Sequence, residues 1–91
     1  MAEITVRPAG EGRFWVRIQA GGSATEHDVT VSRDDLERLG AGRTPDAFVR
    51  DCFDFLLARE PKGSILRSFD VSTIGRYFPE FEREIVRSRE G

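Results

Sequence analysis

Cys52 and His27 are the two side chains best suited to covalent or acid–base chemistry, and each is the single residue of its type in the chain. A reactive cysteine needs exposure and a nearby positive charge, and a histidine base needs a partner within hydrogen-bond reach. Cys52 lies instead in an apolar run, AFVRDCFDFLL, and no spacing connects it with His27. We therefore predict a buried thiol, no catalytic residue and no enzyme activity.

The sequence also lacks the spacings that hold metals, cofactors or phosphates. One cysteine and one histidine do not build a multi-cysteine zinc site. Residues 40–44, GAGRT, precede a predicted helix as anion-binding loops do, but Pro45 removes a donor N–H and Asp46 adds a negative charge. We expect no metal and no cofactor, and we interpret residues 40–44 as a helix end followed by a connection.

A third group of candidates, Arg13, Trp15 and Arg17, shares the outward face of a predicted sheet. Basic residues around an aromatic ring can bind single-stranded nucleic acid. Three acidic side chains balance three basic ones on this face: Glu3, Glu26 and Asp28 against Arg7, Arg13 and Arg17. That balance favours cross-strand salt bridges. An outward tryptophan is either covered by a neighbouring segment or is an interface contact, so we select Trp15, Arg13 and Arg17 as protein-binding residues.

Strands must position these residues. Apolar and polar side chains alternate over residues 3–7, 13–19 and 23–31, and Pro8 is expected to end the first run. Gly21 and Gly22 predict a tight hairpin turn. Residues whose numbers sum to 43 then face each other across the hairpin. The inner face pairs Phe14 with Val29, Val16 with His27 and Ile18 with Thr25, and the outer face pairs Arg13 with Thr30, Trp15 with Asp28 and Arg17 with Glu26.

The sequence after residue 31 predicts helices. Ser32 is a capping residue for a short helix that stops at Gly40, and Thr44 caps a longer helix that runs to about Glu60. A helical turn is expected over residues 64–69, then a helix capped by Asp70 that Pro79 either kinks or separates from a last segment, residues 80–87. Four C-terminal aromatic residues mostly belong to the core, with an exposed patch as the alternative: Phe69, Tyr77, Phe78 and Phe81.

These elements predict a single α+β domain over residues 1–91. Its three-stranded antiparallel sheet, in the N-terminal part, packs against three to four helices in the C-terminal part. The apolar residues of the long helix cover about half its circumference, so we expect this helix to be central. Its core residues are Phe48, Val49, Phe53, Leu56 and Leu57.

Residues 29–60, VTVSRDDLERLGAGRTPDAFVRDCFDFLLARE, resemble a ribbon-helix-helix repressor. The resemblance implies a strand that pairs with a second chain and enters the DNA major groove, with Asp28, Thr30 and Ser32 as the base-reading positions. Asp28 would repel phosphate, and the strand already has a partner within the chain. DNA binding as a repressor or antitoxin is therefore the alternative function.

Residues 59–79, which contain REP, ILRSFD and YFP, are similar to a group of small bacterial proteins of unknown function. That resemblance implies a bacterial domain and no particular activity. The net charge of −2 gives no general attraction to nucleic acid or to anionic membranes, and no apolar run approaches the length of a membrane span. We expect a cytoplasmic, non-catalytic interaction or accessory module. Its partner is a protein, with the chain itself (a homodimer) as one candidate.

Overall fold

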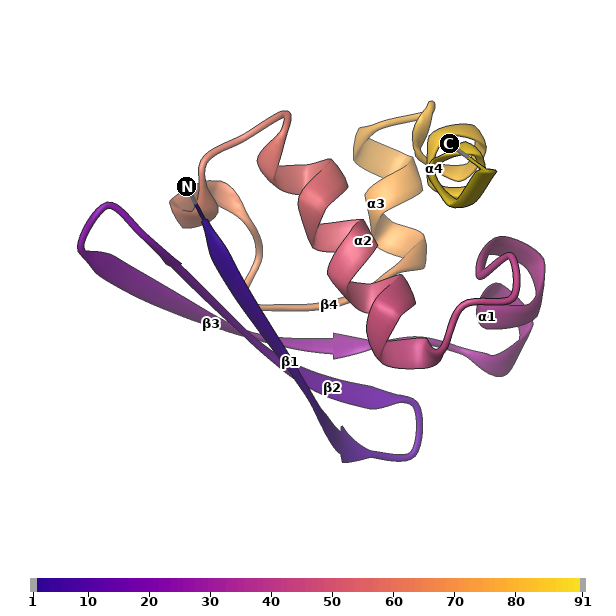
Figure 1. Cartoon of the computed structure of the whole chain (residues 1–91), viewed down its shortest axis with the longest axis horizontal. Helices are drawn as coiled ribbons and strands as arrows, with labels where there is room; N and C mark the ends of the chain where they lie inside the picture. Colours follow the sequence, from indigo (N-terminus) through magenta and orange to yellow (C-terminus); the bar gives the residue numbers. More distant parts are fainter. Residues whose placement is uncertain (1, 91) are drawn as a thin grey trace.

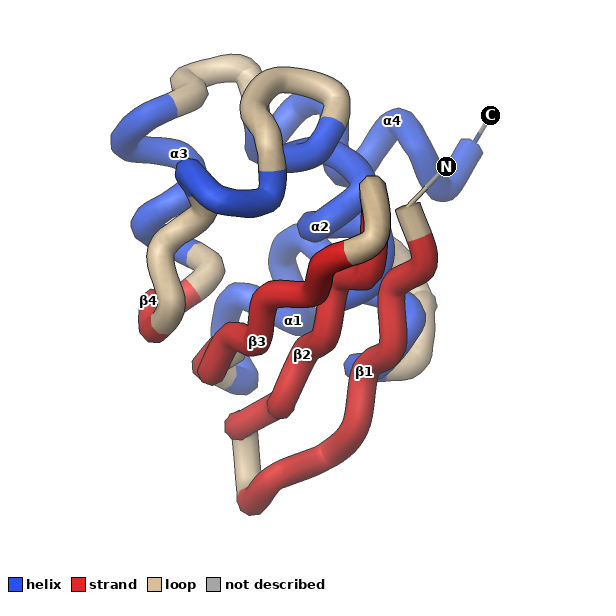
Figure 2. Tube along the Cα trace, turned by 90° about the vertical axis from the view of Figure 1, so that its left-hand side faces the viewer, coloured by secondary structure: helices blue, strands red, loops and turns tan. Residues whose placement is uncertain are grey.

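The computed structural model describes residues 2–90 and has an α+β fold (Figure 1). The strands and helices follow one another along the chain in this order: β1 (Glu3–Gly10), β2 (Arg13–Ala20), β3 (Ser23–Thr30), α1 (Arg33–Leu39), α2 (Pro45–Leu57), the 3₁₀ turn η1 (Lys62–Ser64), β4 (Ser68–Asp70), α3 (Ser72–Tyr77) and α4 (Phe81–Glu90). The helices gather on one side of the sheet, so its other face is left uncovered (Figure 2). No helix described between residues 2 and 90 is long and apolar enough to cross a membrane.

The predicted hairpin and its register are confirmed. Gly21 and Gly22 both have positive φ, 63° and 80°, as a two-residue turn of this type requires. Strands β2 and β3 pair with Phe14 opposite Val29 and with Trp15 opposite Asp28. The inner residues of these strands are therefore buried, and the polar residues between them face outward.

The expectation that Pro8 ends the first strand is wrong. Strand β1 continues through Pro8, which lies opposite Phe14, and the register shifts only between Pro8 and Gly10. The reason is position: β1 lies at an edge of the sheet, where a residue without an N–H costs no ladder bond. The same edge is covered by Arg50 of α2, whose Nη1 donates to the carbonyl oxygen of Ile4 at 2.6 Å.

The sheet has four strands and is mixed, which corrects the predicted three-stranded antiparallel sheet. Residues 64–69 do not form a helical turn, because β4 pairs in parallel with the end of β3. Backbone bonds from Asp28 N to Arg67 O at 2.7 Å and from Val71 N to Thr30 O at 3.0 Å hold it there. A three-residue strand made by long-range pairing has no local alternation to reveal it.

Two of the three predicted helix starts are confirmed, and the third, at Asp70, is displaced by one residue. The Ser32 hydroxyl accepts from the Asp35 amide at 3.0 Å, and the Thr44 hydroxyl accepts from the Ala47 amide at 3.4 Å, each satisfying an amide that has no helical partner. Asp70 lies one residue before the N-terminal cap of α3, where its carboxylate accepts from the Ser72 amide at 3.0 Å. Pro79 separates α3 from α4.

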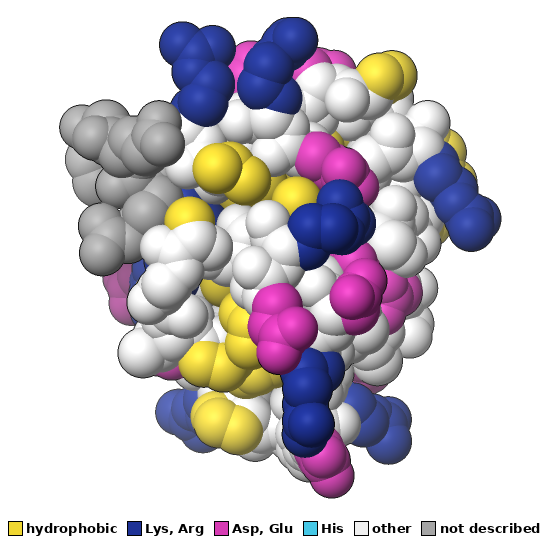
Figure 3. All heavy atoms as spheres, turned by 90° about the vertical axis from the view of Figure 1, so that its right-hand side faces the viewer, with side chains coloured by type: hydrophobic (Ala, Val, Ile, Leu, Met, Phe, Trp, Pro, Cys, Tyr) yellow, Lys and Arg dark blue, Asp and Glu magenta, His cyan; other side chains and the backbone are white. Residues whose placement is uncertain are grey.

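Helix α2 is central, as predicted. Phe48, Val49 and Phe53 are fully buried between the sheet and the other helices, whereas Leu57 is only partly buried. Arg43, just before this helix, fastens α4 to it: its guanidinium, 3% exposed, donates to the carbonyl oxygen of Ile85 at 2.6 Å and lies 3.0 Å from Asp51. On the face that carries α1 and α4, basic and acidic side chains lie side by side (Figure 3).

Candidate functional site

Neither candidate for covalent or acid–base chemistry is available to a substrate. Cys52 is 1% exposed, and its burial raises the pKa of its thiol, so the reactive thiolate is disfavoured. His27 is also 1% exposed. Its Nδ1 lies 2.7 Å from the carbonyl oxygen of Leu66, and its Nε2 lies 2.9 Å from the Thr25 hydroxyl. Both ring nitrogens are thus engaged in the fold.

The outward face of the sheet brings Arg13, Trp15 and Arg17 together on β2, as predicted, but the predicted salt bridges are not formed. The Trp15 indole N–H donates to Glu26 Oε1 at 3.1 Å, and the Arg7 guanidinium lies 5.5 Å from the centre of the indole. None of the ion pairs within residues 2–90 joins two side chains of this face. Cation–π and indole contacts replace them, leaving Trp15 half-buried and Arg13 and Arg17 exposed.

The three base-reading positions implied by the ribbon-helix-helix resemblance have different structural surroundings. Asp28 and Thr30 are exposed on β3, which pairs with β2 on one side and with β4 on the other. The Thr30 hydroxyl donates to Asp70 Oδ1 at 2.6 Å, and Ser32 caps α1. Base reading by these residues stays a prediction.

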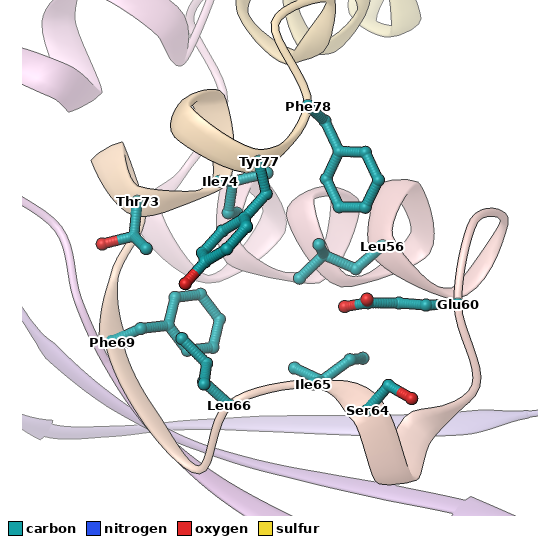
Figure 4. A pocket seen from close by; sticks show the side chains of 10 residues that line it. All are labelled: Leu56, Glu60, Ser64, Ile65, Leu66, Phe69, Thr73, Ile74, Tyr77 and Phe78. Atoms are coloured by element: carbon teal, nitrogen blue, oxygen red, sulfur yellow. The ribbon is translucent and has the colours of Figure 1, made fainter.

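A different surface has the geometry of a binding site. It is an open, largely apolar pocket of about 300 Å³, which we call the Tyr77 pocket (Figure 4). Its lining comes from α2, η1, β4, α3 and the segments that connect or follow them. The lining residues are Leu56, Glu60, Ser64, Ile65, Leu66, Phe69, Thr73, Ile74, Tyr77 and Phe78. Leu66 is 48% exposed and Tyr77 is 67% exposed, and these are the exposed large hydrophobic residues of the described chain.

One charged side chain lines the Tyr77 pocket. Glu60 lies in the bend after α2, and Figure 4 shows its carboxylate extending into the space between Leu56 and Ile65. Glu60 takes part in none of the ion pairs found within residues 2–90. A half-buried carboxylate beside apolar side chains favours a positively charged contact, because the low local dielectric strengthens the attraction.

The walls of the Tyr77 pocket are fixed by the fold behind them. Helix α2 ends near Leu57, and Pro61, which cannot continue it, leads into η1. The following segment is then held against β3 by the bond from His27 to the Leu66 carbonyl. These constraints place Leu66 at the rim, while Ile65 and Ile74 close the floor of the pocket as buried residues.

A second hollow, between α2 and α4, has four charged residues among its seven lining residues: Asp51, Asp54, Phe55, Arg59, Glu84, Ile85 and Ser88. Its charges are largely paired, since Arg59 lies 3.0 Å from Glu80 and 3.8 Å from Glu84. Partial burial, together with the charge of Asp51, raises the pKa of Asp54. Among the described side chains, those of residues 2–88, no group of three or more His, Cys, Asp or Glu is placed to hold a metal ion.

The sequence pointed to part of the Tyr77 pocket and missed the rest. Phe69, Tyr77, Phe78 and Phe81 were expected mostly in the core, with an exposed patch as the alternative; Phe81 is buried, Phe69 and Phe78 are partly buried, and Tyr77 is exposed. Leu66 and Glu60 were not selected. The sequence signal for an exposed aromatic residue here was Tyr77, in a short helix that ends shortly before Pro79.

Comparison with known proteins gives no match: no protein-family model, no curated protein and no solved structure matches the chain.

Proposed function

We propose that this chain is a non-catalytic protein-interaction module whose contact surface is the Tyr77 pocket. The observation that supports this most directly is the exposure of Leu66 and Tyr77, 48% and 67%, at the edge of an apolar hollow. Exposed apolar patches beside a pocket are typical of binding surfaces. Tyrosine is also among the residues that contribute most to binding energy at interfaces.

The chemistry of the pocket lining favours a protein partner over a substrate that reacts there. An enzyme site needs convergent acid, base or nucleophilic groups. The polar side-chain groups of the lining are one carboxylate and three hydroxyl groups, and none of these residues is a histidine, lysine or cysteine: Glu60, Ser64, Thr73 and Tyr77. Such a surface supplies apolar contact and one charge, which suits a docking side chain.

The outward face of the sheet is a second contact surface in this proposal, through Trp15, Arg13 and Arg17. Tryptophan and arginine are enriched among residues that dominate interface energies. The contacts of Trp15 with Arg7 and Glu26 fix its ring before binding, which lowers the entropy lost on association. We further propose a cytoplasmic location, since the single thiol Cys52 is free and buried.

A comparative capture experiment tests the Tyr77 pocket as the contact surface. The immobilised chain, a Leu66→Ser/Tyr77→Ser variant and an Arg13→Ser/Trp15→Ser variant are each exposed to a bacterial lysate. We expect proteins that the wild type and the sheet-face variant retain to be lost by the pocket variant. Equal retention by the pocket variant would refute the assignment, and loss only in the sheet-face variant would transfer it to Trp15. Circular dichroism confirms that both variants are folded.

A further inference from the structure

The surface around the Tyr77 pocket contains both a projection and a hollow. Tyr77 and Leu66 are 67% and 48% exposed, and the hollow of about 300 Å³ lies between them and the end of α2. A two-fold interface uses the same patch on both subunits, so each projection meets the hollow of the other subunit. A single patch with both features is therefore suited to pair with itself.

The charged residues of this patch are also suited to pair with the same patch on a second copy. Glu60 extends into the hollow, and Arg76, exposed, immediately precedes Tyr77 on α3. Neither side chain belongs to an ion pair with the side chains that the structure describes, those of residues 2–88. If Tyr77 of one copy covers the pocket of another, Arg76 of the first copy approaches Glu60 of the second. Two-fold symmetry forms this pair twice.

We propose that the occupant of the Tyr77 pocket is a second copy of this chain, bound in a closed two-fold homodimer. Tyr77 and Leu66 of each copy cover the pocket of the other copy, and Arg76 pairs with Glu60 across the interface. The proposal rests on the proposed function in one respect: it takes the pocket as a contact surface.

Two further quantities are compatible with self-association. The net charge of −2 produces little repulsion between copies. A stable interface buries about 800 Å² per partner, which is roughly a seventh of the 5700 Å² surface of this chain. The end of the molecule formed by η1, β4 and α3 offers a contiguous surface around the pocket.

Light scattering over a dilution series is the first measurement. We expect a molar mass near twice 10.3 kDa at high concentration that falls toward 10.3 kDa on dilution. A Tyr77→Ser variant should weaken the dimer by about tenfold or more, because it removes the central aromatic contact. The exposure of Tyr77 means that this change leaves the monomer fold intact, which circular dichroism verifies.

Charge reversal locates the interface. Glu60→Arg brings two guanidinium groups together, the introduced one and that of Arg76 in the second copy, and Arg76→Glu brings two carboxylates together. Each variant alone should therefore be monomeric. An equimolar mixture of the two variants restores an opposite-charge pair at one of the two symmetric contacts and leaves a reversed but still opposite-charge pair at the other. We therefore expect the mixture to dimerise when neither component does. Arg33→Glu, at an exposed position of α1 away from the pocket, is the matched control and should leave the dimer unchanged.

Three results would overturn the homodimer. These are a mass of 10.3 kDa at every concentration, a dimer that persists in both reversal variants, or a dimer lost in the Arg33→Glu control. The first result leaves the proposed function standing if the pocket variant still loses a captured protein in the lysate experiment. A monomer that also shows no pocket-dependent capture would remove both proposals.

Discussion

The Nδ1 atom of His27 lies 2.7 Å from the carbonyl oxygen of Leu66, which joins the buried centre of the sheet to the rim of the Tyr77 pocket. A carbonyl oxygen only accepts, so Nδ1 donates to Leu66, and Nε2 lies 2.9 Å from the Thr25 hydroxyl. The imidazole also packs on Phe53, with the ring centres 5.5 Å apart. His27 therefore connects the core, β3 and the binding surface.

Replacing His27 should loosen the pocket as well as destabilise the fold. We expect His27→Phe to lower the free energy of unfolding by about 1–3 kcal/mol, because two hydrogen bonds are lost in a buried position. Amide exchange should accelerate from Arg67 to Val71, where β4 is held against β3. Urea unfolding and hydrogen exchange measure the two effects. Thr25→Val, which removes only the Nε2 contact, is the control, and unchanged exchange in His27→Phe would contradict this role.

Asp70 should make stability depend on pH in the acid range. Partial burial raises the pKa of its carboxyl, but hydrogen bonds from Thr30 and Ser72 outweigh that effect, and the net pKa is lowered. A carboxyl with a lowered folded pKa stabilises the fold above its unfolded pKa, about 3.9, and this contribution disappears as pH falls through the folded value.

The variant Asp70→Asn isolates this contribution. At pH 7 we expect a loss of about 0.5–1 kcal/mol, reduced by solvent screening because the group is largely exposed. Urea midpoints of wild type and variant should converge as the pH is lowered toward about 3, below the unfolded pKa of an aspartate. Glu11→Gln, in an exposed turn, serves as the control. A difference that stays constant at all pH values would rule out the Asp70 carboxylate as its source.

Cys52 should be inert in the folded protein. It is 1% exposed and burial raises the pKa of its thiol, so a thiol reagent at neutral pH should modify it only through unfolding. Labelling in increasing urea should therefore follow the unfolding curve measured by circular dichroism. Fast labelling without denaturant would show that the thiol is accessible and would reopen a catalytic role.

Arg43 should determine how firmly α4 is attached. Its guanidinium is 3% exposed and donates to Ile85 O at 2.6 Å and to Ser88 Oγ at 2.8 Å. We expect Arg43→Met to cost about 1–3 kcal/mol, less than a fully buried ion pair, because Asp51 remains partly hydrated. Amide exchange in α4 should increase more than in α2. Arg87→Met, on the exposed side of α4, provides the comparison. Equal effects of the two changes on stability and on amide exchange would argue against a role of Arg43 in attaching α4.

Local sequence rules predicted the structure correctly where the interacting residues are close in sequence. The turn at Gly21 and Gly22 determined every pair of the hairpin, and the capping residues Ser32 and Thr44 located two helix starts. Strand β4 was missed because its three residues become a strand only by pairing with the distant end of β3, where Phe69 lies opposite Val29. Pro8 was misjudged because its place at the sheet edge is a property of the whole sheet.

The binding surface was harder to predict than the fold. Exposure of Tyr77 and burial of Phe81 depend on which side of each short helix meets α2, and the clustering of aromatic residues in this part of the sequence does not reveal that. The outward position of Trp15 followed from strand parity. Its contact with Glu26 did not, because Glu26 lies diagonally across the ladder from Trp15 and directly opposite Arg17.

The partly blocked edge of β1 affects how readily strands of separate molecules can pair. Asp28 donates its amide toward β4, so alternation along the paired strands directs the backbone groups of Ile4, Val6 and Pro8 outward from β1. The Ile4 carbonyl is already bound by Arg50, and Pro8 offers no N–H. A strand arriving from another molecule would find Val6 alone fully available. The β1 edge is therefore a poor template for fibril growth, and crowded solutions of this protein should resist amyloid-like polymerisation through it.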